Sequence, residues 1–216
     1  AATAYNRGQI LYRVAEMLEG RRSQFVALGE QPSTVDAAVD RWIWYAGWSD
    51  KIAQVFGATN PVAGPYLSVS APEPMGVVGI VAPAESALLG LVSVIAPAIV
   101  TGNAVVVLAS ERHPLPAVTL AEVLATSDLP GGVVNLLTGR VAETAPWLAS
   151  HLDVNAIDLC GVVDPALAAE LAVAAAQNLK RVVRPPAGPV DWAAEPDVDR
   201  MLAFLATKTV WHPKGI

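Results

Sequence analysis

The middle of the chain alternates between short apolar runs of strand length and longer apolar runs of helical length. Residues 77–82 are rich in β-branched side chains, residues 88–100 form an apolar run too long for a strand, and residues 104–108 form a second short run. Two parallel strands joined by a helix make a βαβ unit, whose ligand site normally lies at the carboxyl ends of the strands. Those ends are predicted at residues 83–86 and 109–111.

The same alternation continues to residue 183. Asp164 is expected to cap a helix that has Pro165 in its first turn. Right-handed helical crossovers between successive strands predict an α/β fold, a Rossmann-like open parallel sheet of about five strands with helices on both faces. The further strands are expected at residues 133–137, 156–159 and 181–183, and the further helices at residues 114–127, 142–150 and 165–179.

Two helices are predicted before this sheet. Residues 5–28 carry apolar side chains at helical spacing and end before Gly29. Residues 33–56 form a second helix that ends before Gly57. The second helix holds an aromatic cluster, which is either a ligand platform or core packing, and this spacing favours core or interface packing. The cluster consists of Trp42, Trp44, Tyr45 and Trp48.

Two segments fall outside the alternation. Residues 64–71 alternate polar and apolar positions between prolines, which predicts an exposed strand. A final strand is predicted at residues 207–212 and has no crossover partner, so we expect it to pair with residues 66–71. These segments suggest a domain at residues 1–184 with a strand excursion at 62–74, a proline-rich linker at 185–196, and a tail of one short helix and one strand at 197–216.

Composition narrows the function classes. Hydrophobic residues make up 53% of the chain and charged residues 16%, which indicates a globular protein with a large core. The net charge of −6 and the absence of a basic stripe argue against nucleic-acid binding. The uncharged stretch 86–110 is divided by Gly102 and Asn103 into pieces too short to cross a bilayer, so no membrane span is expected.

The cysteine and histidine content points to a reducing compartment and to no metal site. A lone cysteine, Cys160, excludes an internal disulfide, and no signal peptide pattern precedes the first helix, so a cytoplasmic location is expected. The chain begins at Ala1 rather than at Met, which leaves open a preceding segment. His113, His151 and His212 lack the spacing of metal ligands, so no metal is expected.

Seven phrases, taken in order, resemble the aldehyde dehydrogenase superfamily. Six are similar to successive segments of that family's cofactor-binding domain, and the seventh is similar to the carboxyl-terminal strand of full-length members. Each phrase is weak alone, but the ordered set covers nearly the whole chain. The phrases are RGQILYRVAEMLE, WYAGWSDKI, GVVGIVAP, IAPAIVTGNAVVVLASE, LPGGVVNLLTG, AAAQNLKRV and TKTVWHP.

The resemblance implies a site for NAD or NADP at the carboxyl ends of the strands. Where the family has a lysine and a glutamate for the adenine ribose, this chain has Leu108 and keeps the glutamate, and Val162 replaces a serine that faces the pyrophosphate. Cofactor binding is therefore expected to be weakened, and binding of no cofactor remains the alternative. The cofactor-binding positions that the resemblance retains are Ala82, Pro83, Ser110, Glu111 and Gly161.

The family's catalytic groups have no match in this chain, so no catalytic residue is expected. Glu85 stands where the family has the amide that stabilises an oxyanion, and an ionised carboxylate can only accept hydrogen bonds. Pro185 stands where the family has its general base, and the domain that carries the nucleophilic cysteine has no counterpart here. Cys160 lies in a different phrase, LCGV, and is read as a small core residue.

The resemblance thus suggests a catalytically incomplete subunit. Its expected partner is a full-length aldehyde dehydrogenase paralogue, or a second copy of itself, contacted through the edge strands at residues 66–71 and 207–212. The alternative is an NAD-binding subunit of an active aldehyde-oxidising enzyme whose catalytic cysteine comes from another chain.

Overall fold

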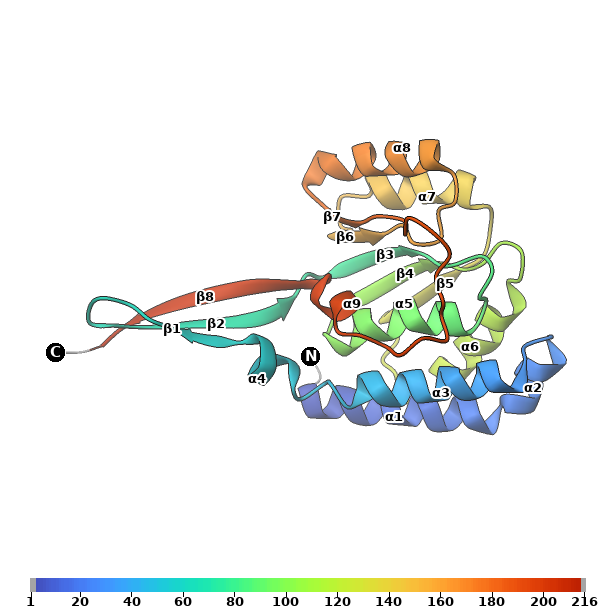
Figure 1. Ribbon diagram of the computed structural model, residues 1–216, viewed down its shortest axis with the longest axis horizontal. Coiled ribbons are helices and arrows are strands. Elements are labelled where there is room, and N and C mark those ends of the chain that lie inside the picture. The colour runs from blue at the N-terminus through green and yellow to red at the C-terminus, as the bar shows by residue number, and fades with distance from the viewer. Residues whose placement is uncertain (1–2, 215–216) are drawn as a thin grey trace.

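The computed structural model describes residues 3–214 and shows a body with a β-ribbon projecting from it (Figure 1). The body contains a five-stranded parallel sheet in the order β5-β4-β3-β6-β7, which confirms the predicted fold class. The first two strands along the chain, β3 and β4, pair directly, as expected for a βαβ unit. The five strands are β3 (Val77–Val81), β4 (Ala104–Leu108), β5 (Val134–Leu137), β6 (Ala156–Asp158) and β7 (Arg181–Val183).

Helices cover both faces of this sheet. On one face lie α5 (Leu89–Val100) and α6 (Leu115–Ala125), and on the other lie α7 (Val141–Ser150) and α8 (Pro165–Ala175), as Figure 1 shows. Every residue of α5 is buried, because this helix is sandwiched between the sheet and a further helical layer. Its lack of charge therefore reflects burial in protein, and none of the described helices is long and apolar enough to cross a membrane.

The further layer consists of α1 (Ala4–Gly20), α2 (Arg22–Ala27), α3 (Pro32–Ala46) and α4 (Ile52–Phe56). The prediction of two long helices was wrong here, because each is broken once. The first breaks at Arg21, next to Gly20, a residue of low helix propensity. The second breaks after Ala46, and the chain folds back so that the Trp48 ring stacks on Phe56 with 6.0 Å between ring centroids.

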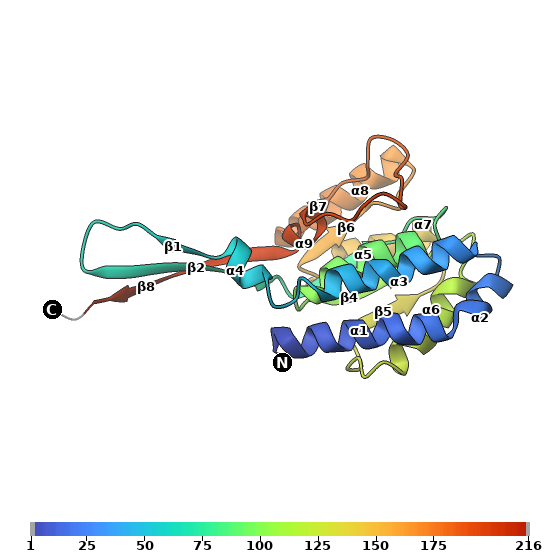
Figure 2. The same cartoon turned by 60° about the horizontal axis from the view of Figure 1, so that its bottom comes forward.

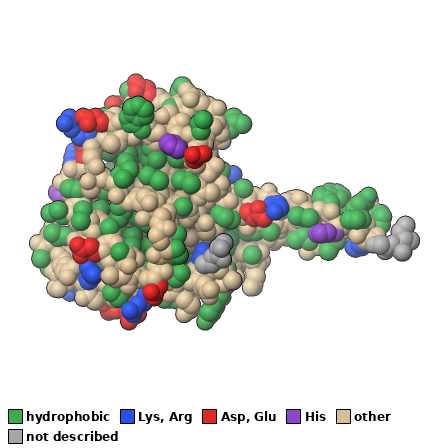
Figure 3. All heavy atoms as spheres, turned by 180° about the vertical axis from the view of Figure 1, so that it is seen from behind, with side chains coloured by type: hydrophobic (Ala, Val, Ile, Leu, Met, Phe, Trp, Pro, Cys, Tyr) green, Lys and Arg blue, Asp and Glu red, His purple; other side chains and the backbone are tan. Residues whose placement is uncertain are grey.

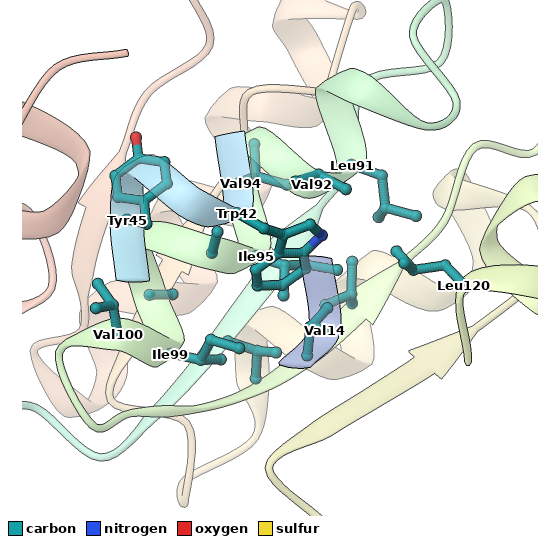
Figure 4. Close-up of a cluster of buried hydrophobic side chains, with 14 of the residues drawn as sticks. Val14, Trp42, Tyr45, Leu91, Val92, Val94, Ile95, Ile99, Val100 and Leu120 are labelled. Carbon is teal, nitrogen blue, oxygen red and sulfur yellow. The ribbon is translucent and has the colours of Figure 1, made fainter. Parts of the chain in front are cut away.

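The aromatic cluster packs in the core, as predicted. Trp42 and Tyr45 on α3 are 0% and 1% exposed, and Figure 4 shows Trp42 among side chains from the neighbouring helices, including Val14 and Ile95. Among the described residues, Trp42 Nε1 is the one buried side-chain polar atom without a hydrogen-bond partner. The cluster fixes α1 and α3 onto α5, with Trp42 and Tyr45 buried and with Trp44 and Trp48 half-buried against the core.

The ribbon is a separate antiparallel sheet of β1 (Ala58–Asn60), β2 (Tyr66–Pro74) and β8 (Leu205–Pro213), with β2 in the middle. The register runs from Tyr66 opposite Pro213 to Pro74 opposite Leu205, so the predicted pairing of the excursion with the tail strand is confirmed. Both strands are longer than predicted. Figures 1 and 2 show that the ribbon extends well beyond the helices of the body.

The proline-rich segment between β7 and the short helix α9 (Asp199–Leu202) is irregular but lies against the body. Arg41 on α3 donates hydrogen bonds to the carbonyl oxygens of Trp192 and Ala194, at 2.9 and 2.8 Å. Phe204, just after α9, is fully buried in the main core. The segment is thus tied to the body by side chains of α3 and by the core contacts of the tail.

Helix α8 ends earlier than predicted. It stops at Ala175, and a short 3-10 turn (Ala176–Asn178) follows. Leu179 then takes a left-handed backbone conformation, with φ of 57°, which ends the helical path before β7. The predicted start is correct, since the Asp164 carboxylate accepts a hydrogen bond from the backbone N–H of Ala166 and Pro165 occupies the first turn.

Candidate functional site

The carboxyl ends of β3, β4 and β6 meet at one edge of the parallel sheet. The backbone N–H of Ala82, just after β3, donates to Leu108 O on β4 at 2.9 Å. The N–H of Gly161, after β6, donates to Val81 O on β3, also at 2.9 Å. The structure therefore brings together the positions singled out in the sequence, which are Ala82, Pro83, Ser110, Glu111 and Gly161.

Gly161 allows two backbone segments to approach closely at this edge. A Cβ atom added there would lie 2.0 Å from the carbonyl oxygen of Ala82, a distance that no side chain tolerates. The glycine is therefore required by packing between the ends of β3 and β6.

Ser110 and Glu111 both hold the loops of the edge in place. The Ser110 hydroxyl is buried, donates to Ala84 O at 2.8 Å and accepts from the His113 N–H at 3.1 Å. Glu111 Oε2 accepts from the backbone N–H of Val141 at 2.8 Å, in the first turn of α7. A carboxylate is stabilised there by the unpaired N–H groups and dipole of the helix.

At three positions near this edge the chain differs from the pattern that the resemblance implies, and the side chains there are either buried and apolar or exposed to solvent. Leu108 and Val162 are 3% and 4% exposed and pack in the smaller core beneath α7 and α8. Glu85 is exposed and forms an ion pair with Arg112, across the two loops that follow β3 and β4. These side chains therefore place no neutral hydrogen-bond donor at the edge.

Residues 1–210 match the sequence profile of the aldehyde dehydrogenase family. The chain belongs to the aldehyde dehydrogenase family. It is 32% identical over 212 residues to the mitochondrial aldehyde dehydrogenase of Rattus norvegicus and 33% identical to that of Sus scrofa, and each match covers 89% of this chain and 40% of the relative.

Solved aldehyde dehydrogenase structures share the fold. An NAD+ complex of the enzyme from Bacillus cereus superposes with a TM-score of 0.77 at 26% identity, covering 84% of this chain and 38% of that one. A putative aldehyde dehydrogenase from Burkholderia cenocepacia gives 0.78 at 28% identity, covering 84% and 39%. The chain thus spans about 40% of the length of the relatives it matches.

NAD(P) binding is a trait of the aldehyde dehydrogenase family, and the residues of this chain fit such a cofactor in part. The carboxyl ends of β3, β4 and β6, where the resemblance implies the cofactor, meet at one edge of the sheet. At Leu108 and Val162, however, buried apolar side chains stand where the resemblance implies polar contacts. Glu111 has one carboxylate oxygen already bonded to α7. The shape of an aldehyde dehydrogenase cofactor edge is retained, with fewer polar groups to hold a ligand.

Cys160 is a buried core residue, as the sequence suggested. It is 9% exposed, and its Sγ lies 3.4 Å from Val81 O as a hydrogen-bond donor. Burial raises the pKa of the thiol well above its usual range, and the nearby Asp158 raises the pKa further. A thiol in this state is a poor nucleophile, because the thiolate is the reactive form.

Sequence reasoning missed Asp158, a carboxyl group that is 0% exposed at the end of β6. Arg200 on α9 forms an ion pair with it at 2.7 Å, and the N–H of Cys160 donates to its other oxygen at 2.9 Å. Burial raises the pKa of Asp158, while the charge of Arg200 and the hydrogen bonds oppose that rise. The sequence feature that could have identified Asp158 is its place in an otherwise apolar strand. Its partner, Arg200, lies 42 positions away in the tail and could not be found from the neighbouring residues.

In the described part of the chain, residues 3–214, no group of three or more His, Cys, Asp or Glu side chains is arranged to hold a metal ion. The chemistry available at the edge is therefore that of backbone N–H and C=O groups, the Ser110 hydroxyl and the Glu111 carboxylate. Such groups bind and orient a polar ligand, but they include no activated nucleophile.

Proposed function

We propose that this chain is a catalytically incomplete aldehyde dehydrogenase-like subunit that acts as a structural or regulatory partner of a full-length aldehyde dehydrogenase. The observation that carries the proposal is the free edge of β8. Within the described residues, this nine-residue strand pairs on one side with β2 and on the other side with no strand. Unpaired backbone groups along such an edge favour pairing with a strand of another chain.

The side chains of the ribbon support the same proposal. Tyr66 and Trp211 pack edge to face with 5.9 Å between ring centroids, and they are 42% and 58% exposed. Large aromatic side chains that remain exposed on a projecting element are typical of protein contact surfaces. A full-length paralogue is the favoured partner, and a second copy of this chain is the alternative.

The chemistry of the edge supports the catalytic part of the proposal. Glu85 offers a carboxylate acceptor where the resemblance implies an amide donor, and it forms an ion pair with Arg112. Pro185 has no group that could take a proton at the position of the general base. A cytoplasmic location is proposed on the free thiol of Cys160, which suits a reducing compartment.

Native mass spectrometry after co-expression with a full-length aldehyde dehydrogenase from the same organism tests the partner. We expect a hetero-complex that is weakened by Trp211→Glu on the ribbon. The matched control is Trp147→Glu on α7, an indole that is 78% exposed but far from β8 in the chain. A monomer without any complex would contradict the proposal, and a homodimer alone would favour the alternative partner.

The second candidate function is an NAD-binding subunit of an active aldehyde-oxidising enzyme, and the Glu111 carboxylate retained at the edge favours it. Loss of two hydrogen bonds, each worth about 1–3 kcal/mol, would raise a micromolar dissociation constant toward the millimolar range. We therefore expect calorimetric titration with NAD and NADH to give weak binding or none. A low micromolar dissociation constant would favour this second function instead.

A further inference from the structure

Part of one sheet face is left uncovered beside α7. Gly79 on β3 lets α7 sit directly over that strand, because a Cβ at this glycine would lie 2.8 Å from Leu148 Cγ. With α7 held there, it contacts β3 and β4 but leaves part of this face open toward β5, where Leu137 is 47% exposed. Figure 3, which views the molecule from behind, shows apolar side chains gathered on the surface of the body.

The uncovered region contains a concave site that we name the strand-face hollow. Its volume is about 410 Å³, and its walls are almost wholly apolar. Val106 and Leu137 form part of the floor, and Trp147 on α7 forms a wall. The residues lining it are Val77, Val106, Leu108, Leu137, Thr144, Trp147, Leu148, His151, Asp153 and Val154.

We propose that the strand-face hollow binds an uncharged apolar small molecule that carries one hydroxyl or carbonyl group. Its volume lies within the range of about 300–1,000 Å³ that is typical of small-molecule sites, which are mostly apolar with a few placed polar groups. The hollow runs from Val77, opposite Ala104, to Leu108, four residues further along β4. At about 3.3 Å per residue, it is long enough for an extended alkyl chain or a ring system.

Two polar side chains at one end of the hollow define the ligand's polar group. His151 Nδ1 accepts a hydrogen bond from the Asp153 N–H at 3.2 Å, so in neutral His151 the ring hydrogen lies on Nε2. That N–H can donate to a ligand oxygen. The Asp153 carboxylate can accept from a hydroxyl, and its negative charge disfavours a carboxylate ligand. An alcohol thus suits this end better than a fatty acid anion.

The size of the hollow argues against a protein partner. It is lined by ten residues, whereas a stable protein interface takes about 20–30 residues on each side. The hollow also differs from the cofactor edge. His151 and Asp153 lie beyond the carboxyl end of α7, while Glu111 contacts the amino end of that helix. The hollow therefore adjoins the cofactor edge only at Leu108, and its polar end lies at the opposite end of α7.

Ligand-observed NMR with n-octanol and octanoate as probes tests this proposal on the full chain. We expect n-octanol to bind the wild type and octanoate to bind at least about tenfold more weakly. Leu137→Lys places a charge in the wall at an exposed position and should weaken n-octanol binding by about tenfold or more. The control is Leu67→Lys on the ribbon, another strand leucine, which is 41% exposed and should bind like the wild type.

Circular dichroism spectra and thermal midpoints of both variants establish that each is folded. The proposal is overturned if n-octanol fails to bind the wild type, if Leu137→Lys binds it unchanged, or if octanoate binds as tightly. A wild-type dimer that Leu137→Lys converts to a monomer would also overturn it, because the hollow would then be a protein contact.

Discussion

Replacing Arg200 with an uncharged residue should lower the free energy of unfolding, because the buried Asp158 carboxylate then has no partner of opposite charge. The two side chains are 2.7 Å apart, and Asp158 is fully buried. At an effective dielectric constant of about 20, Coulomb's law gives about 6 kcal/mol of attraction at that distance. Loss of this attraction is partly relieved by protonation of the carboxyl, so we expect Arg200→Met to lower the free energy of unfolding by about 3–5 kcal/mol near neutral pH.

The loss should depend on pH in a defined direction. Burial raises the pKa of Asp158, so between its unfolded and folded pKa values the native state holds the extra proton and stability falls as the pH rises. Without Arg200 the folded pKa rises further, which widens this window. The deficit of Arg200→Met should therefore grow by up to about 1.4 kcal/mol per pH unit between the folded pKa of the wild type and the higher folded pKa of the variant, and it should be smaller in acid.

Urea unfolding followed by circular dichroism at about pH 5 and about pH 8 measures both effects. The double variant Asp158→Asn/Arg200→Met should recover much of the loss, because no unpaired charge stays buried. The matched control is Arg22→Met, whose ion pair with Asp36 is exposed, so its unfolding midpoint should stay close to that of the wild type at both pH values. A deficit below about 1 kcal/mol for Arg200→Met, or one that is unchanged between the two pH values, would refute this reasoning.

Three further outcomes are expected. Gly161→Ala should lower the thermal midpoint by well over 5 °C, since a Cβ would lie 2.0 Å from a carbonyl oxygen, whereas Gly131→Ala, with no atom within 4 Å, should change it little. Cys160 should resist iodoacetamide in the native protein and react in urea, as intact mass would show, because burial raises its pKa; equal rates would contradict this. Asp164→Ala should cost about 0.5–2 kcal/mol in urea unfolding through the lost cap of α8, and an unchanged midpoint would count against that role.

The sheet could be predicted because its signals are local. The β-branched run at Val77–Val81 and the charge-free run at Leu89–Val100 are long enough to distinguish strand from helix, and the alternation of strands and helices then predicts a parallel sheet. The helical layer was predicted less well. The breaks at Arg21 and after Ala46 depend on where the chain must turn to keep α1 and α3 packed on α5. The spacing of apolar residues along a helix does not predict the position of such a turn.

The candidate edge was only partly accessible to sequence reasoning. Positions at strand ends followed from the predicted topology, so Ser110, Glu111 and Gly161 could be placed near one another in advance. Their contacts could not, because Glu111 bonds to a helix thirty residues further along the chain. The buried pair of Asp158 and Arg200 joins a strand to the tail across 42 positions. The residues next to each side chain therefore do not indicate that the two will form an ion pair.

By itself, the sequence determined the parallel sheet and the pairing of the tail with the excursion strand, because apolar periodicity follows from local chemistry, and its ordered phrases indicated the family by resemblance. Only the tertiary structure decided which charged side chains are buried together and which part of the sheet is left without a helix over it. Packing of α7 over Gly79 leaves part of the sheet face open toward β5, and folding of the tail onto α3 brings Arg200 to Asp158. Both are contacts between segments distant in the chain, whose geometry is set when the layers pack and not by any one segment.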